Sequence, residues 1–173
     1  QPRLSTSLML VALRYRNFRL VWLGSLTEHV GEFMEIAGIL WLVNELTHSP
    51  LWLSIVGSCR FMPMIFLPLV GGVVADRVNR RRLLIIALLG SASLSVALLV
   101  LGATGLLAVP ALIVISLLSG VVMSFNHPAR QSIVPNLVNR EHLLNAISLD
   151  TLSVQMSRAI GTPIGGYLIA ALG

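Results

Sequence analysis

The sequence predicts an all-α membrane protein with five transmembrane helices. Of its 173 residues, 55% are apolar and only 11% are charged, and the mean hydropathy is +0.86. A soluble domain of this length needs far more polar surface. Apolar runs of about 20 residues alternate with short polar segments, and a run of that length crosses a bilayer as a helix.

The helices are expected at residues 18–43, 51–74, 83–101, 107–125 and 145–173. Residues 1–17 contain scattered arginines and no pattern of a cleaved leader, so they are expected to form a basic arm on the membrane surface. The polar stretch NELTHSP separates the first two helices, with Pro50 at the restart. Gly102, Gly105 and Pro110 leave room only for a tight hairpin between the third and fourth helices.

The arginines predict the orientation of these helices. All 12 basic residues are arginines, and ten of them fall in the N-terminal arm, in the turn after the second helix and in the segment after the fourth. The turns after the first and third helices contain none. Because positive residues accumulate on the cytoplasmic side, we expect a multi-pass protein of the cell (inner) membrane with a cytoplasmic N terminus. This distribution is typical of a topology signal and not of a nucleic-acid surface.

The turn after the second helix reads GGVVADRVNRRRLL, and it matches a known spacing, G-x-x-x-D-R-x-G-R-R/K, at five positions: Gly72, Asp76, Arg77, Arg80 and Arg81. The chain therefore resembles the major facilitator superfamily, in which this motif belongs to the cytoplasmic gate. Asn79 replaces the usual glycine, and asparagine tolerates a left-handed backbone better than most residues. Topology alone also produces a basic turn, but it does not explain Gly72 or Asp76.

Three further segments are similar to the branch of that superfamily that contains the enterobactin exporter and macrolide efflux proteins. They are FRLVWLGSLTEHVGEFMEIAGILWLVNELTHSPLWLSIVG, FNHPARQSIVPNLVNREHLLNAISL and SRAIGTPIGGYL. The last contains a glycine-proline cluster: Gly161, Pro163, Gly165 and Gly166. Thr162 separates the first glycine from the proline, unlike the pattern of the branch. A hinge in the fifth helix and simple close packing are both compatible with this cluster.

The resemblance implies two bundles of six helices built from inverted repeats, so the chain is expected to be an N-terminal fragment that works with a C-terminal bundle. It also implies a secondary active exporter of drug-type or siderophore-type small molecules that works by alternating access. The expected partners are a small-molecule substrate, protons and membrane lipid; no cofactor, metal ion or nucleic acid is expected. An arginine motif found in the fourth helix of many proton-coupled members is absent.

An enzyme is disfavoured because no nucleophile and base pair, phosphate-binding loop or metal-ligand cluster is evident. His127 and His142, near the end of the fourth helix, lack further ligands at suitable spacing. Cys59 lies in an apolar run and is expected to be a small packing residue. A non-transporting membrane subunit for assembly or interaction is the alternative from another class.

Ionisable residues inside apolar spans are costly and mark functional positions. Glu28, Glu32 and Glu35 fall within an arc of about 60° on the first helix, and the resemblance matches Glu32 best to an acidic position of the branch. Arg60 and Arg158 lie in the second and fifth spans. The carboxylates either exchange protons during alternation, bind a cationic or polar substrate, or pair permanently with these two arginines. Because the carboxylates outnumber the arginines, the sequence favours at least one as a proton carrier.

Overall fold

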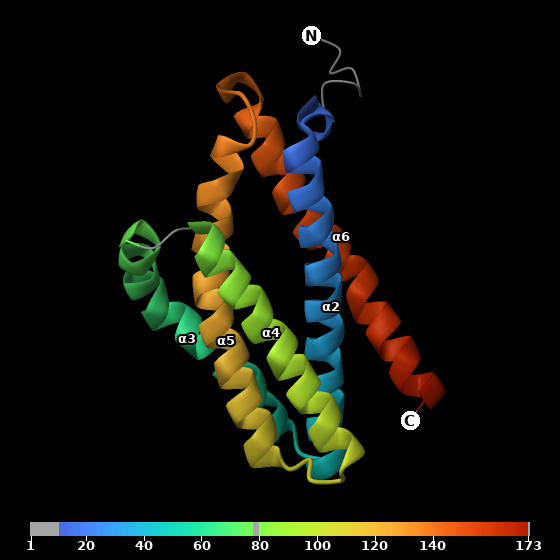
Figure 1. Cartoon of the computed structure of the whole chain (residues 1–173). Helices are drawn as coiled ribbons and strands as arrows, with labels where there is room; N and C mark the ends of the chain where they lie inside the picture. The colour runs from blue at the N-terminus through green and yellow to red at the C-terminus, as the bar shows by residue number, and fades with distance from the viewer. Residues whose placement is uncertain (1–10, 78–79, 173) are drawn as a thin grey trace. The chain divides into compact units, whose positions relative to one another are not determined.

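The computed structural model describes residues 11–77 and 80–172, with side chains described except at residues 68–80 and 172, and five long helices account for most of it (Figure 1). The elements in chain order are η1 (Val11–Arg14), α2 (Arg16–Thr47), α3 (Pro50–Arg77), α4 (Arg80–Ala103), α5 (Val109–Ile133), η2 (Val134–Asn136), η3 (Arg140–His142) and α6 (Leu143–Leu172). No strand occurs in the described ranges. The predicted all-α fold is confirmed there, and each long helix overlaps one of the expected ranges.

Three helices are long and apolar enough to cross a membrane, judged over the described residues: Pro50–Leu67, Arg81–Ala103 and Val109–Asn136. With 32 and 30 residues, α2 and α6 have sufficient length at about 1.5 Å per residue, but their polar residues lower the hydropathy. The carboxylates Glu28, Glu32 and Glu35 lie in α2, and Arg158 lies in α6. Composition and length therefore support three of the five expected spans.

The chain divides into two compact units, Gln1–Gly38 with Ile133–Gly173, and Ile39–Ser132. The first unit contains η1, most of α2, the two short turns η2 and η3, and α6. The second contains the end of α2 together with α3, α4 and α5. Each unit is built around its own helix contacts.

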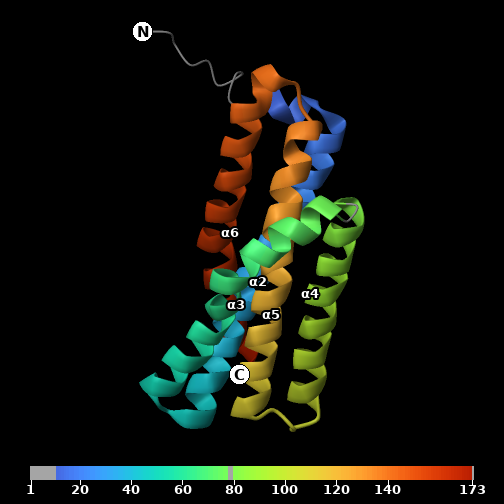
Figure 2. The ribbon, with the colours of Figure 1, turned by 90° about the vertical axis from the view of Figure 1, so that its left-hand side faces the viewer.

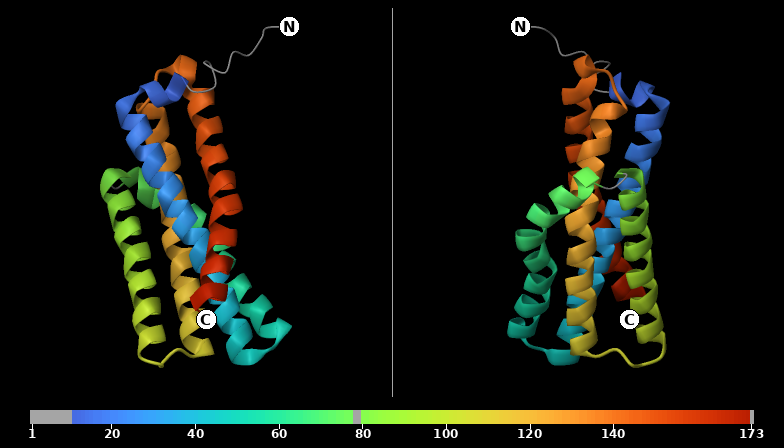
Figure 3. Two further views of the ribbon diagram at one scale, coloured as in Figure 1. Left: turned by 90° about the vertical axis from the view of Figure 1, so that its right-hand side faces the viewer. Right: turned by 60° about the vertical axis from the view of Figure 1, so that its left-hand side comes forward.

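In the first unit, α2 and α6 run in the same direction and lie against each other (Figures 1 and 3). Three close contacts, each between residues 131 positions apart, connect Ser157 to Leu26, Gly161 to Val30, and Gly165 to Met34. The hydroxyl of Ser157 donates to the carbonyl oxygen of Leu26 at 3.1 Å. A constant offset at every fourth residue keeps one line of small side chains on α6 against one face of α2. Small residues at this spacing let two helix backbones approach closely.

The other end of the α2–α6 contact is fixed by hydrogen bonds. The indole Nε1 of Trp22 donates to the carbonyl oxygen of Leu149 at 2.9 Å. The backbone N–H of Ala12 donates to Oδ1 of Asn145 at 3.1 Å. An apolar cluster surrounds these bonds and consists of Ala12, Phe18, Val134, Val138, Ala146 and Leu149. The start of α2 is therefore held to the start of α6 by both polar and apolar contacts.

In the second unit, α3 and α5 approach closely at Gly120. A Cβ atom at this position would overlap the carbonyl oxygen of Arg60 and lie 3.1 Å from Cδ of Pro63. Proline removes a backbone donor and bends a helix, and the curvature of α3 is visible in Figure 3. Helices α4 and α5 form an antiparallel hairpin (Figure 2), in which Gly105 adopts a φ of +68°. Glycine adopts this left-handed conformation without steric cost.

The α2–α6 contact predicts the effect of adding one methyl group to α6. In Gly161→Ala the new Cβ would lie 2.7 Å from the carbonyl oxygen of Val30, so we expect the full-length protein to lose about 1–3 kcal/mol of stability. The matched control is Gly166→Ala, because nothing lies within 4 Å of that Cβ position. Thermal unfolding in detergent measures both. Equal melting temperatures for the two variants would contradict the proposed helix contact.

Candidate functional site

The acidic stripe consists of Glu28, Glu32 and Glu35 on α2, and all three side chains are half-buried in the first unit. The residues of α2 that touch α6, such as Val30 and Met34, lie roughly 100–160° around the helix from these glutamates at 100° per residue. The acidic stripe therefore does not face α6. It forms a separate polar face on a helix that is otherwise mostly apolar.

The acidic stripe contains an ionisable pair that the sequence analysis missed. Nδ1 of His29 lies 3.3 Å from Oε2 of Glu32, and both side chains are shielded, with relative exposures of 6% and 16%. The spacing of three residues on a helix brings the two side chains together. The sequence could have predicted this contact, because His29 precedes the central Glu32 by three residues. The pair places a titratable ring directly against one of the three carboxylates.

Arg158 lies on α6, and its guanidinium carbon is 5.2 Å from the centre of the Phe33 ring. No carboxylate forms an ion pair with Arg158 in the part of the chain that the structure describes. The structure thus brings Arg158 to an aromatic ring of α2 and does not bring it to the acidic stripe. The side chain is exposed within its unit.

Arg60 belongs to the second unit, where α3 positions it. Its side chain is buried, with 8% of its surface exposed. Its carbonyl oxygen faces Gly120 of α5, where the two helices pack closely. The contact with α5 therefore holds the backbone of α3 at Arg60, whose guanidinium is buried.

The gate motif lies at the junction of α3 and α4. Gly72, Asp76 and Arg77 lie in the last two turns of α3, and Arg80 and Arg81 begin α4. The side chain of Arg81 is exposed. The other four side chains, and Asn79, fall outside the described residues, so the structure gives the motif only a place at two helix ends.

The glycine-proline cluster of α6 divides between two faces. Gly161 and Gly165 are buried against α2, where a Cβ on Gly165 would lie 3.2 Å from Cα of Met34. Pro163 and Gly166 are exposed, and α6 continues through the proline to Leu172. The two buried glycines therefore lie in the close contact between α6 and α2 within the first unit.

A second buried cation is Arg130, which the sequence pattern marks only as a topology signal. Arg130 on the last turns of α5 has 6% of its surface exposed, and Asn126, one turn earlier, has 3%. A spacing of four residues places them on one face of the helix. The four-residue spacing in the sequence already indicates this shared face, but it does not indicate that the face is buried.

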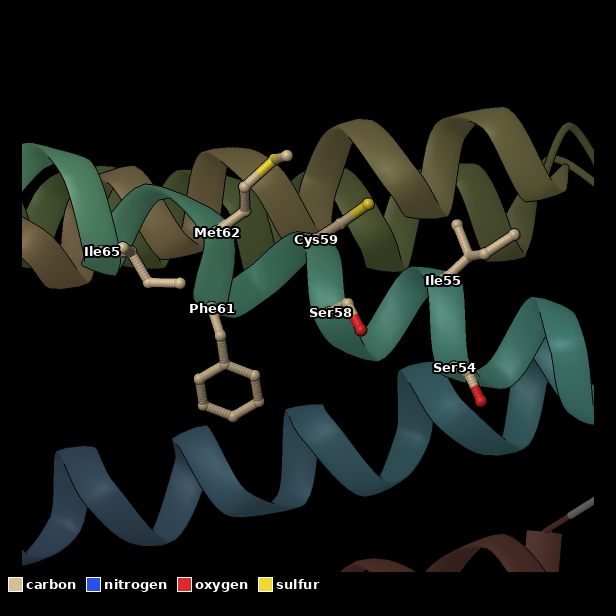
Figure 4. A pocket seen from close by; sticks show the side chains of 7 residues that line it. All are labelled: Ser54, Ile55, Ser58, Cys59, Phe61, Met62 and Ile65. Atoms are coloured by element: carbon tan, nitrogen blue, oxygen red, sulfur yellow. The ribbon is translucent and has the colours of Figure 1, made fainter.

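A hollow on the surface of α3 contains polar and sulfur-bearing side chains. Figure 4 shows its lining residues: Ser54, Ile55, Ser58, Cys59, Phe61, Met62 and Ile65. All of them come from one helix, so no polar groups converge on it from different elements. Cys59, expected to be a packing residue, is half-exposed here. In the described ranges, no three histidine, cysteine or acidic side chains gather closely enough to hold a metal ion.

Comparison with known proteins identifies the family. The model of the family described as transmembrane secretion effector matches residues 7–173. The staphyloferrin A transporter of Staphylococcus aureus is 29% identical over 143 residues, which cover 82% of this chain and 36% of that protein. The enterobactin exporter EntS of Citrobacter koseri is 31% identical over 138 residues, 76% of this chain and 32% of that protein. EntS of Salmonella typhimurium is 30% identical over 138 residues, with the same coverage.

The chain spans about a third of the length of these relatives. No solved structure matches it. The match of the family model covers nearly all of the chain, and its apolar helices are those of a multi-pass membrane protein. The chain therefore belongs to the transmembrane secretion effector family of the major facilitator superfamily, a superfamily of membrane transporters.

Proposed function

We propose that the protein is a secondary active exporter of siderophore-type small molecules that works by alternating access and is coupled to protons. Family membership supports transport, and the names of two relatives, staphyloferrin A transporter and enterobactin exporter, support a siderophore as substrate and export as direction. The observation that carries the proposal is the acidic stripe on α2 with its His29–Glu32 pair. Carboxylates within a membrane helix are retained where they line a path for substrate or protons.

All five long helices are proposed to span the membrane, with the N terminus in the cytoplasm. The polar faces of α2 and α6 then line a water-filled path instead of lipid, which explains why hydropathy alone supports only α3, α4 and α5. The arginine distribution along the chain supports the orientation. In the complete protein, these helices are proposed to move against a C-terminal bundle of the same chain.

Glu32 and His29 are proposed to carry the coupling proton. The ring of His29 lies 3.3 Å from the carboxylate of Glu32, so a proton held at this pair has two neighbouring groups that can accept it. Opening toward the two sides of the membrane in turn would expose the pair to two proton concentrations, so proton binding shifts the balance between the two conformations. Glu28 and Glu35 extend the same polar face toward either end.

The gate motif is proposed to close the cytoplasmic side. Asp76 lies in the last turn of α3, where a negative charge opposes the helix dipole. A carboxylate at this unfavourable position is expected to have a partner that compensates it, such as basic residues or the N terminus of a facing helix. Formation and loss of that contact would link the gate to the conformational change.

Replacing Glu32, the proposed proton carrier, with glutamine removes its charge and keeps the size of its side chain. In Glu32→Gln we expect proton-driven enterobactin uptake into everted membrane vesicles to fall below about a tenth of the wild-type rate, because a gradient drives only a step that moves protons. The matched control is Glu45→Gln, an exposed glutamate near the end of the same helix. Transport by Glu32→Gln that keeps its full dependence on an imposed pH gradient would eliminate Glu32 as the coupling residue.

The gate motif predicts a defect in turnover without a defect in insertion. In Asp76→Asn we expect normal protein levels in the membrane and a transport rate reduced by roughly tenfold, the loss of one charged hydrogen bond. Glu141→Gln is the matched control, since Glu141 is an exposed acidic residue in η3. Wild-type transport by Asp76→Asn would show that the aspartate has no part in gating.

The alternative function is a membrane subunit for assembly or interaction that transports nothing. Export of enterobactin by cells that express the full-length protein, compared with and without an imposed pH gradient, separates the two functions. Export above that of cells lacking the protein supports a transporter. If correctly inserted protein exports none of the tested siderophores or drugs, the result favours the assembly or interaction subunit.

A further inference from the structure

The unit formed by α2 and α6 exposes a second polar face, on α6, which we call the α6 polar face. It consists of Thr151, Gln155, Arg158 and Thr162, and all four side chains are exposed. The spacings of four, three and four residues place them within an arc of about 60°. The opposite side of the helix is apolar and exposed, as at Met156 (40%) and Ile160 (45%). The middle of α6 therefore carries a polar face next to its contact with α2.

Arg158 lies at the middle of α6. It is 15 positions after Leu143 and 14 before Leu172, about 22 and 21 Å along the axis at 1.5 Å per residue. A single side chain does not bridge such a distance to reach the interface of a membrane, as arginines near helix ends do. The guanidinium therefore stays at the depth of the bilayer centre if α6 spans the membrane as proposed.

The described surroundings of Arg158 supply an aromatic ring and no anion. The guanidinium lies over Phe33, which itself packs against Gly161 with its Cβ 3.1 Å from the Cβ position of that glycine. Phe33 therefore belongs to the α2–α6 contact. A cation–π contact occupies a face of the guanidinium and leaves the N–H donors at its edge available. The acidic stripe lies on another face of α2 and does not neutralise this charge.

We propose that the α6 polar face is a binding site for an anionic group of the transported molecule, with Arg158 as its anchor. The inference rests on the proposed transport function and adds the charge of the substrate to it. Arg158 donates two parallel hydrogen bonds to a carboxylate or an oxyanion of similar shape, the geometry for which guanidinium groups are best suited. Gln155 and Thr162 flank it with further hydrogen-bonding groups. Phe33 limits the movement of the guanidinium and offers an apolar surface to the rest of the ligand.

The first test compares two dyes of opposite charge in everted vesicles that contain the full-length protein. For Arg158→Gln we expect the KM for carboxyfluorescein to rise roughly 10- to 100-fold, the loss of a charged hydrogen bond, while ethidium transport stays at the wild-type rate. Arg158→Lys keeps the charge without the planar fork, so we expect a smaller rise. Arg140→Gln, an exposed arginine in η3, is the control and should change neither dye.

The charge-selective pattern distinguishes binding from stability. Equal losses for both dyes in Arg158→Gln would show a structural role for the arginine and overturn the site. Wild-type protein that moves ethidium but not carboxyfluorescein would also overturn it. Enterobactin export that persists while carboxyfluorescein is not bound or moved would sink this inference and leave the proposed transport function intact.

A second test does not depend on transport. In full-length protein with Cys59 and any other cysteines replaced by serine, we expect Thr162→Cys to react with the anionic thiol reagent MTSES, and Ile160→Cys on the apolar face to stay unmodified. Carboxyfluorescein should slow the reaction of Thr162→Cys, and this protection should disappear when Arg158→Gln is added. An unreactive Thr162→Cys would mean that another part of the protein covers this face, and it would contradict the proposed site. Protection that persists in Arg158→Gln would show that the arginine does not take part in binding.

Discussion

The close packing of α6 on α2 is the constraint on which the candidate sites of this protein depend. Ser157, Gly161 and Gly165 present almost no side chain, so the two backbones approach at every fourth residue with one constant offset. This contact uses one face of each helix. It thereby decides which remaining faces of α2 and α6 are available for polar groups, and it brings the ring of Phe33 to the guanidinium of Arg158.

Two polar faces result, and they have different chemistry. The face of α2 carries three carboxylates and a shielded histidine in contact with Glu32. The face of α6 carries a guanidinium with uncharged hydrogen-bonding neighbours. A transporter that exchanges protons for an anionic molecule needs both kinds of group, and their separation around the helix contact prevents the charges from cancelling each other. In the transporter we propose, the acidic stripe would serve proton coupling and the α6 polar face would bind the substrate.

The long helices follow from the sequence because apolar runs and polar breaks are local signals. Pro50 begins α3, and Gly105 adopts the left-handed turn of the α4–α5 hairpin, at the positions where the sequence indicated breaks. The acidic stripe was predictable for the same reason, since helical spacing alone places Glu28, Glu32 and Glu35 together. The pairing of Arg158 with these glutamates was one hypothesis from the sequence, but helical spacing does not say which face of α2 receives α6. The burial of Arg130 was equally invisible, because an arginine at the end of an apolar run has the same pattern whether it is buried or exposed.

By itself, the sequence determined the helical architecture, the family and the positions of the ionisable residues along each helix, because composition, periodicity and motif spacing are properties of single segments. Only the tertiary structure decided which of these residues meet. The line of small residues on α6 determines which face of α2 it contacts, through close backbone packing between segments more than 130 positions apart. No local sequence pattern predicts that contact. Whether Arg158 meets a carboxylate or an aromatic ring depends on that packing.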